Sequence, residues 1–329
     1  MKKLALAAAA LGISLAAMLQ PVAAIAQENW PPRKITFVVA LGPGGSADRT
    51  ARALAQRLQE ELDTPISVIN QEGGGGHVGH TYFTQMPADG SYFLATSIHP
   101  YISNAILRFD ADYSLDDFAF INGQWNDHDL FAVNVDTPYQ TLAEFMDAAK
   151  AEPGKLKVSV VPGSTGAINL ELALEAFGVD KSAVNIVTYQ SGGAARTAVA
   201  GGQVDMTVLA ADGTLSIAEY VRPLALAADE PSADWDAPTL NAALEKNGLE
   251  TVPVLAGSMR GLAAHATFKQ EHPEAFQKMV AAYQAVLEDE EFVANLKEQK
   301  IGTEWLGPER TTKIIKSNFD VLKRFDTEE

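Results

Sequence analysis

Four glycine-rich segments contain most of the residues that could bind a ligand in this chain of 329 residues. They occupy residues 42–48, 73–79, 162–166 and 190–193. Glycine has no Cβ, so backbone N–H groups in such segments can approach a bound group directly, and neighbouring Ser, Thr and His side chains add donors. None of the four segments contains Lys or Arg. They therefore predict that an anion is bound by oriented N–H and hydroxyl donors at helix starts.

Each segment follows a predicted strand, and three of them precede a predicted helix. β-branched apolar runs indicate strands at 34–41, 66–70, 92–96, 130–135, 157–161, 185–188 and 205–210. Amphipathic stretches indicate helices at 47–62, 141–151, 167–177, 194–200, 273–300 and 308–325. This alternation predicts an α/β fold with two open sheets, each flanked by helices. In such sheets ligands bind beyond the carboxyl ends of the strands, so the four segments are expected to surround one site.

The length and the repeated order of elements predict two lobes. About 300 mature residues exceed the usual size of a single hydrophobic core. We expect residues 27–127 and 229–329 to form lobe 1 and residues 128–228 to form lobe 2, with crossings near Asp127 and Ala228. Neither lobe alone has enough donors to neutralise an anion, so both should close over it.

The amino terminus has the pattern of a secretory signal. Lys2 and Lys3 precede an apolar run over residues 4–18, and Pro21 and a small-x-small motif at residues 24–26 follow. We expect cleavage after Ala26 and export to the periplasm. The alternative is an uncleaved membrane anchor, because the segment approaches the length that spans a bilayer.

Composition excludes several classes of function. The chain has 25 basic and 42 acidic residues, and loss of Lys2 and Lys3 with the signal changes its net charge from −17 to −19. Such a charge repels DNA and RNA. The chain has no cysteine, which excludes disulfides, thiolate metal sites, thiol nucleophiles and a lipid-modified cysteine. We expect a monomer that is not an enzyme and binds no cofactor.

The main alternative is a dinucleotide-dependent oxidoreductase. Gly42, Gly44 and Ala47 fit the G-x-G-x-x-A fingerprint between a strand and a helix, and Glu72 lies just past the second strand. Pro43 is unusual in that fingerprint, however, and an exported protein meets little free nicotinamide cofactor.

Metal binding and hydrolysis have less support. His77 and His80 are spaced as a metal pair on a helix, but they follow four glycines and have no carboxylate motif nearby, so no metal site is predicted. The chain also lacks the Gly-x-Ser-x-Gly elbow of serine hydrolases.

Taken together, the segments resemble the substrate-binding proteins of tripartite tricarboxylate transporters, the Bug family. The resemblance runs from Trp30-Pro31 through strand 34–41, the first two glycine segments and PADGSYFLAT (87–96). It continues through PGSTG (162–166), YQSGGAARTAVAGGQVD (189–205) and RPLALA (222–227). The resemblance implies a two-lobed Venus-flytrap protein that closes over a small carboxylate and presents it to a membrane permease.

The resemblance also implies which residues contact the ligand, mainly through backbone N–H groups, hydroxyls and water. In the first lobe these are Gly44, Gly45, Ser46, Asp48, Gly75, Gly76, His77 and Ser97. In the second lobe they are Ser164, Thr165, Gly166, Asn169 and Asp212. Asp48 has an alternative role as a first-turn acid that favours the helix dipole.

Three departures from the family pattern bear on the identity of the ligand. Residues 40–43 (ALGP) replace a Pro-Phe-Pro-Pro-like run, residues 71–74 (QEGG) replace an Arg-Pro-Gly-Ala-like run, and Gln190 replaces a frequent Lys or Arg. Arg196, one turn into the helix after the fourth segment, is the competing candidate for a carboxylate-binding fork. Its position inside a helix favours a solvent-facing role.

Overall fold

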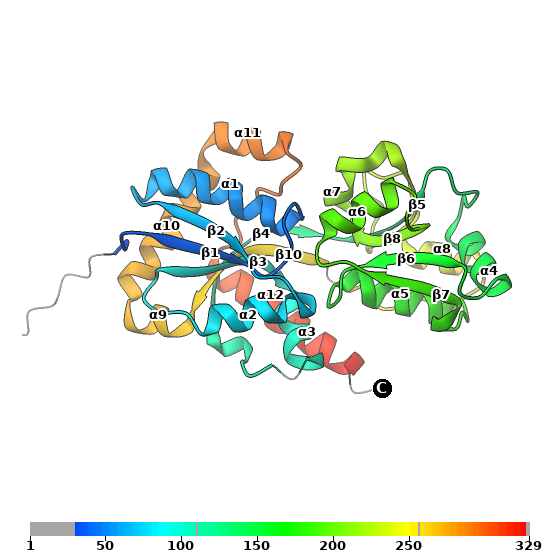
Figure 1. The fold of residues 1–329 in the computed structure, drawn as a ribbon, viewed down its shortest axis with the longest axis horizontal. Helices are drawn as coiled ribbons and strands as arrows, with labels where there is room; N and C mark the ends of the chain where they lie inside the picture. Colours follow the sequence, from blue (N-terminus) through cyan, green and yellow to red (C-terminus); the bar gives the residue numbers. More distant parts are fainter. Residues whose placement is uncertain (1–29, 110, 256, 327–329) are drawn as a thin grey trace, which may run out of the picture.

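The computed structural model describes residues 30–326, apart from residues 110 and 256. The expected signal segment and its cleavage point after Ala26 lie outside these residues. Figure 1 shows two α/β units side by side, which we call lobe A and lobe B. Within the described part of the chain, no helix is both long and apolar enough to cross a membrane.

Lobe A is built on a five-stranded sheet in the order β2-β1-β3-β10-β4. Its strands are β1 (Ile35–Val39), β2 (Ile66–Asn70), β3 (Tyr92–His99), β4 (Phe118–Asp127) and β10 (Ser258–His265). Strand β1 pairs in parallel with β2 and β3, whereas β10 runs antiparallel to β3 and β4. Strand β1, which lies between β2 and β3, is buried on both faces, as its largely apolar sequence predicts.

Helices cover both faces of the lobe A sheet. They are α1 (Ser46–Glu61), α2 (His77–Thr84), α3 (Tyr101–Arg108), α9 (Ala266–Glu271), α10 (Pro273–Glu288), α11 (Glu290–Glu298) and α12 (Gly307–Asp326), with 3-10 turns at Gly74–Gly76 and Leu115–Asp117. Phe37 of β1 packs in one core with Leu54 of α1 and Met279 of α10. The next residue, Val38, points to the opposite face and packs with Ile102 of α3.

Lobe B has a second five-stranded sheet, in the order β7-β6-β8-β5-β9. Its strands are β5 (Asp129–Asn134), β6 (Leu156–Val160), β7 (Val184–Thr188), β8 (Met206–Ala210) and β9 (Val221–Ala227). Its helices are α4 (Leu142–Ala151), α5 (Thr165–Ala176), α6 (Gly192–Ala200), α7 (Ala211–Thr214) and α8 (Leu240–Lys246), with 3-10 turns at Lys181–Ala183 and Leu215–Tyr220. Phe131 of β5 packs toward Phe145 of α4, and the adjacent Ala132 packs toward Val199 of α6.

The chain crosses between the lobes twice. The first crossing is at His128, between β4 and β5. The second lies between α8 and β10, so the crossing that we expected near Ala228 is wrong. Residues beyond Ala228 still belong to lobe B, because Trp235 packs beside Leu130 and Leu244 of α8 packs beside Phe131.

Candidate functional site

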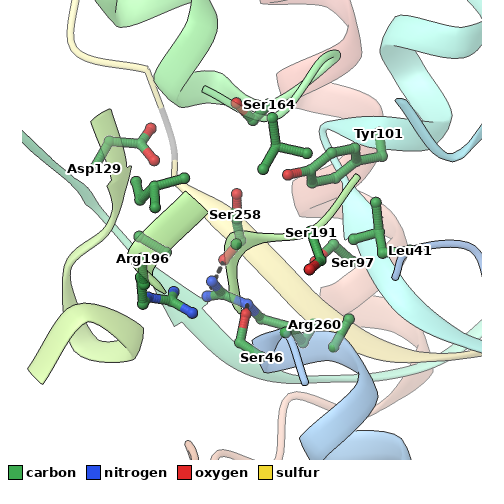
Figure 2. A pocket seen from close by; sticks show the side chains of 16 residues that line it. Leu41, Ser46, Ser97, Tyr101, Asp129, Ser164, Ser191, Arg196, Ser258 and Arg260 are labelled. Carbon is green, nitrogen blue, oxygen red and sulfur yellow. Dashed lines mark hydrogen bonds between the residues drawn. The ribbon is translucent and has the colours of Figure 1, made fainter. Parts of the chain in front are cut away.

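A cavity of about 30 Å³ lies between the lobes, where the carboxyl ends of β1 and β3 face those of β6, β7 and β8. Lobe A contributes Leu41, Gly45, Ser46, Ala47, Ser97, Tyr101, Ser258 and Arg260. Lobe B contributes Asp129, Val161, Ser164, Ser191, Gly192, Arg196, Leu209 and Ala210. Figure 2 shows side chains from both lobes pointing into this space.

Three helix N-termini meet at the cavity. Helix α1 begins after its N-cap Gly45, α5 after Ser164 and α6 after Ser191, and all three cap residues line the cavity. The Ser164 hydroxyl accepts a hydrogen bond from the Ala167 amide at 3.1 Å, and the Ser191 hydroxyl accepts one from Ala194 at 3.3 Å. The Ser164 hydroxyl also bonds to the Tyr101 hydroxyl, whereas the Ser191 O–H is left to donate. Helix N-termini with free O–H donors favour an anion.

Arg260 enters the cavity from β10 and has several partners in lobe A, including a carboxylate. Its side chain is 2% exposed and lies 3.3 Å from the Asp127 carboxylate. Its Nε donates to the Ser46 hydroxyl at 3.0 Å, and its Nη1 donates to the Ser258 carbonyl at 3.0 Å. The guanidinium also lies 4.6 Å from the centre of the Trp125 ring. Arg260 therefore helps to build the wall that it lines.

Arg196 enters the cavity from α6 and has fewer hydrogen-bonding and charged partners than Arg260. The residue is 4% exposed, and its Nε donates to the Thr214 hydroxyl at 3.3 Å. No carboxylate of the described residues lies within 4.0 Å of it. Its guanidinium lies close to Gly192 and Gly213, and a Cβ at Gly213 would overlap it. Burial, aided by repulsion from Arg260, lowers the pKa of Arg196 to about 10, so it remains cationic near neutrality.

Asp129 is a buried acid in the lobe B wall. It is 2% exposed, and its Oδ2 accepts a hydrogen bond from Asn169 at 3.0 Å. Among the residues that the structure describes, no Lys or Arg nitrogen lies within 4.0 Å of this carboxylate. Burial raises the pKa of Asp129 above its ordinary value. The cavity therefore contains an acid and an arginine that are not paired with each other.

Hydrogen bonds between the lobes surround the cavity and hold it closed. The Gly42 amide donates to the Gln190 carbonyl at 3.0 Å. The Asn104 side chain donates to the Gly163 carbonyl at 2.6 Å, and the Trp125 indole donates to the Asp212 carboxylate at 3.0 Å.

Four of the residues expected to contact a ligand line the cavity. They are Gly45, Ser46, Ser97 and Ser164. Gly44 and Asp48 instead shape the first loop, where the Gly44 amide donates to Asp48 at 3.0 Å. Burial alone would raise the pKa of Asp48, but hydrogen bonds from Arg52, Gly44 and Asn70 hold it below its ordinary value. This arrangement corresponds to the alternative role as a first-turn acid.

The second glycine segment lies outside the cavity wall. Gly75 and Gly76 form the 3-10 turn before α2, and a Cβ at Gly75 would lie 2.6 Å from the Pro162 carbonyl oxygen of lobe B. The His77 ring contacts the Tyr113 hydroxyl at 3.3 Å and stacks on Phe109. This segment therefore brings the lobes into contact. Among the described residues, no group of His and acidic side chains could hold a metal ion.

The remaining expected residues do not line the cavity but contact the residues that form its wall. Thr165 is buried at the start of α5, and a Cβ at Gly166 would overlap the Val208 carbonyl of β8. Asn169 holds Asp129, and Asp212 accepts from Trp125. Arg260, Asp129 and Tyr101 line the cavity but were not predicted to do so, and Arg196 was expected to face the solvent. One signal in the sequence was the i, i+3 spacing of Arg196 and the apolar Val199, which places both on the face of α6 that is buried.

The first glycine loop is occupied by contacts with lobe B, which argues against a dinucleotide site. Besides the bond from Gly42 to Gln190, a Cβ at Gly193 would lie 2.7 Å from the Gly44 carbonyl oxygen. The loop therefore contacts the N-terminus of α6 where a pyrophosphate would have to lie. The oxidoreductase alternative is not supported.

Comparisons with known proteins show relatives in sequence and in fold. Protein BugT of Bordetella pertussis is 28% identical over 213 residues, which are 64% of this chain and 63% of BugT. MatC from Rhodopseudomonas palustris, solved with bound malate, has a TM-score of 0.77 at 20% identity and covers 90% of this chain and 99% of its own. A second R. palustris protein, solved with adipate, has a TM-score of 0.75 at 24% identity and covers 90% of this chain and 96% of its own.

These structural likenesses confirm the two-lobed α/β fold. The sequence matches to the first curated relatives span only 51–63% of the length of those proteins. The model of the tripartite tricarboxylate transporter family receptor matches residues 50–324, most of the chain. This family consists of receptors for transport and not of enzymes. The chain therefore belongs to the tripartite tricarboxylate transporter receptor family.

Proposed function

We propose that this chain is a periplasmic receptor that captures a small carboxylate between its lobes and delivers it to the permease of a tripartite tricarboxylate transporter. The observation that carries the proposal is the closed cavity, into which three helix N-termini and the guanidiniums of Arg196 and Arg260 are directed. The family match and the relatives solved with malate and adipate support a carboxylate ligand. The signal-like residues 1–26 support export.

We propose that the ligand contacts come from the cavity wall and not from all four glycine segments. Gly45, Ser46, Ser97 and Ser164 are retained from the expected set, with Ser191 and Arg196 added. The other expected residues then act indirectly, by fixing the conformation of the loops and by bringing the lobes into contact. They are Gly44, Asp48, Gly75, Gly76, His77, Thr165, Gly166, Asn169 and Asp212. Hydrogen bonds to a charged group contribute ~1.5–3 kcal/mol each, so three or four donors are enough for micromolar binding, about 8 kcal/mol.

The proposal is tested by thermal unfolding of residues 27–329 against a panel of mono-, di- and tricarboxylates that includes malate and adipate. A ligand that binds only the folded state at a concentration of 100 Kd adds ~2.7 kcal/mol to stability. NAD serves as the negative control. A panel in which no carboxylate raises the melting temperature contradicts the proposed function.

Closure by the ligand is tested by small-angle scattering. The bonds between the lobes, such as that from Asn104 to Gly163, form only when the lobes meet. We expect the radius of gyration to fall when the best ligand of the panel is added and the protein to remain a monomer. An unchanged radius at saturation indicates a rigid site that is already formed.

A further inference from the structure

Two buried charges in the cavity wall have no Lys, Arg or carboxylate partner of opposite charge within 4.0 Å among the described residues. Arg260 and Asp127 pair with each other at 3.3 Å. Among the described residues, Arg196 has only the Thr214 hydroxyl as a hydrogen-bonded side-chain partner, and Asp129 is held by the neutral Asn169 amide and Thr165 hydroxyl. Arg196 is 4% exposed and Asp129 is 2% exposed. Figure 2 shows both on the same side of the cavity, opposite Tyr101 and Leu41.

Charges in such an environment need partners. Burial of an ionised group costs several kcal/mol unless an opposite charge or several hydrogen bonds compensate for it. Here the two groups without a charged partner have opposite signs and line one cavity. The charges of Arg196, Arg260, Asp127 and Asp129 also sum to zero when all four are ionised. A ligand with no net charge keeps this balance when the lobes close, whereas a simple carboxylate adds negative charge.

We propose that the cavity binds a compact zwitterion, an amino acid whose carboxylate pairs with Arg196 and whose ammonium group pairs with Asp129. This inference rests on the proposed receptor function and specifies its ligand. The O–H group of Ser191 supplies a further donor for the carboxylate, and the Ser164 and Tyr101 hydroxyls, which bond to each other, lie in the same wall. The small cavity, about 30 Å³ with the lobes closed as here, favours a compact ligand over a long one.

Matched ligands isolate the contribution of the ligand's amine to the binding affinity. Calorimetric titration of residues 27–329 would compare alanine with lactate and propionate, and aspartate with malate and succinate. Within each set the skeleton is the same, and only the amine is replaced by a hydroxyl or by hydrogen. We expect the amino acid of at least one set to bind at least tenfold more tightly than both of its analogues.

A variant then assigns the preference to Asp129. Asp129→Asn keeps the size of the side chain but removes its charge, so the preference for the amine should fall at least tenfold while the analogues bind at least as well as before. Asp205→Asn is the matched control, because Asp205 is also in lobe B but accepts from the Lys157 backbone away from the cavity. This variant should keep the preference. The comparison of ligands on the unaltered chain does not depend on whether Asp129→Asn folds.

Three results overturn the inference. In the first, carboxylates without an amine bind as tightly as the amino acids, and the binding heat depends on the buffer in the way expected for proton uptake. Asp129 would then be a protonated donor, consistent with the raised pKa that its burial causes. In the second, only longer carboxylates such as adipate bind, which leaves the receptor function intact. In the third, no carboxylate or amino acid binds, and the proposed function fails as well.

Discussion

The two walls of the cavity each contain a buried arginine, but they neutralise it differently. In lobe A, Arg260 has the Asp127 carboxylate, the Ser46 hydroxyl, the Ser258 carbonyl and the Trp125 ring as partners. In lobe B, Arg196 has one hydroxyl and two glycine backbones around it. The arginine in lobe A thus has a carboxylate partner without a ligand, whereas the arginine in lobe B has none among the described residues and can pair with a ligand. The difference separates an arginine that maintains the structure from one that is available to a ligand.

The largest expected effect is on stability, from Arg260→Met. Its removal leaves the Asp127 carboxylate buried without a cation, and breaking a buried pair in this way costs ~3–5 kcal/mol. Urea unfolding of residues 27–329 without ligand measures the loss. Arg196→Met is the matched comparison and should cost less than half as much, because Arg196 has no carboxylate partner to leave behind. Equal losses would show that the two arginines have the same structural role.

The second effect is on binding, from the same Arg196→Met variant. Removal of one partner of a buried charge pair costs ~2–5 kcal/mol, which corresponds to a Kd weaker by about thirtyfold or more. Calorimetry with the tightest ligand of the panel measures it. Arg222→Met is the control, because Arg222 donates to the Val135, Thr137 and Tyr139 carbonyls instead of lining the cavity. Unchanged affinity in Arg196→Met would support binding by backbone donors alone.

A third and smaller effect is expected from Ser164→Ala. One hydrogen bond to a charged acceptor is lost, ~1.5–3 kcal/mol, or about ten- to a hundredfold in affinity. The change also removes the N-cap of α5 and costs ~0.5–2 kcal/mol of stability. Thr141→Ala removes the equivalent cap of α4 but should leave affinity unchanged, because Thr141 does not line the cavity. Equal losses of affinity in both variants would mean that Ser164 acts only through the stability of lobe B.

The difference between the walls also explains what the sequence could predict. Three of the four glycine segments end a strand and start a helix, as expected, because their local turn chemistry is visible in the sequence. Strand β10 (SMRGLAAH) was missed, since it has no β-branched residue and is buried throughout. Arg260 lies on that strand, and its partner Asp127 is 133 residues away in the chain. Only the fold brings the two together.

The smallest expected effect comes from Gly213→Ala, which alters the position of Arg196 without removing its charge. Gly213 does not have a positive φ, so alanine fits its backbone, but the new Cβ would overlap the Arg196 guanidinium. Gly192 is also close to the guanidinium, since a Cβ built on Gly192 would lie 3.4 Å from it. The Arg196 side chain therefore has little space into which it can move. A displaced guanidinium loses part of its bidentate geometry toward the carboxylate. We therefore expect the affinity for the ligand to fall about tenfold, ~1.4 kcal/mol.

Gly201→Ala is the control for Gly213→Ala, since Gly201 ends α6 away from the cavity and also has an ordinary φ. A double-mutant cycle with Arg196→Met assigns the mechanism. If Gly213→Ala acts through Arg196, it has no further effect on binding in the Arg196→Met background. If it weakens binding equally in both backgrounds, it acts instead through the hydrogen bond from the Gly213 amide to Asp127, and the effect belongs to the lobe A pair.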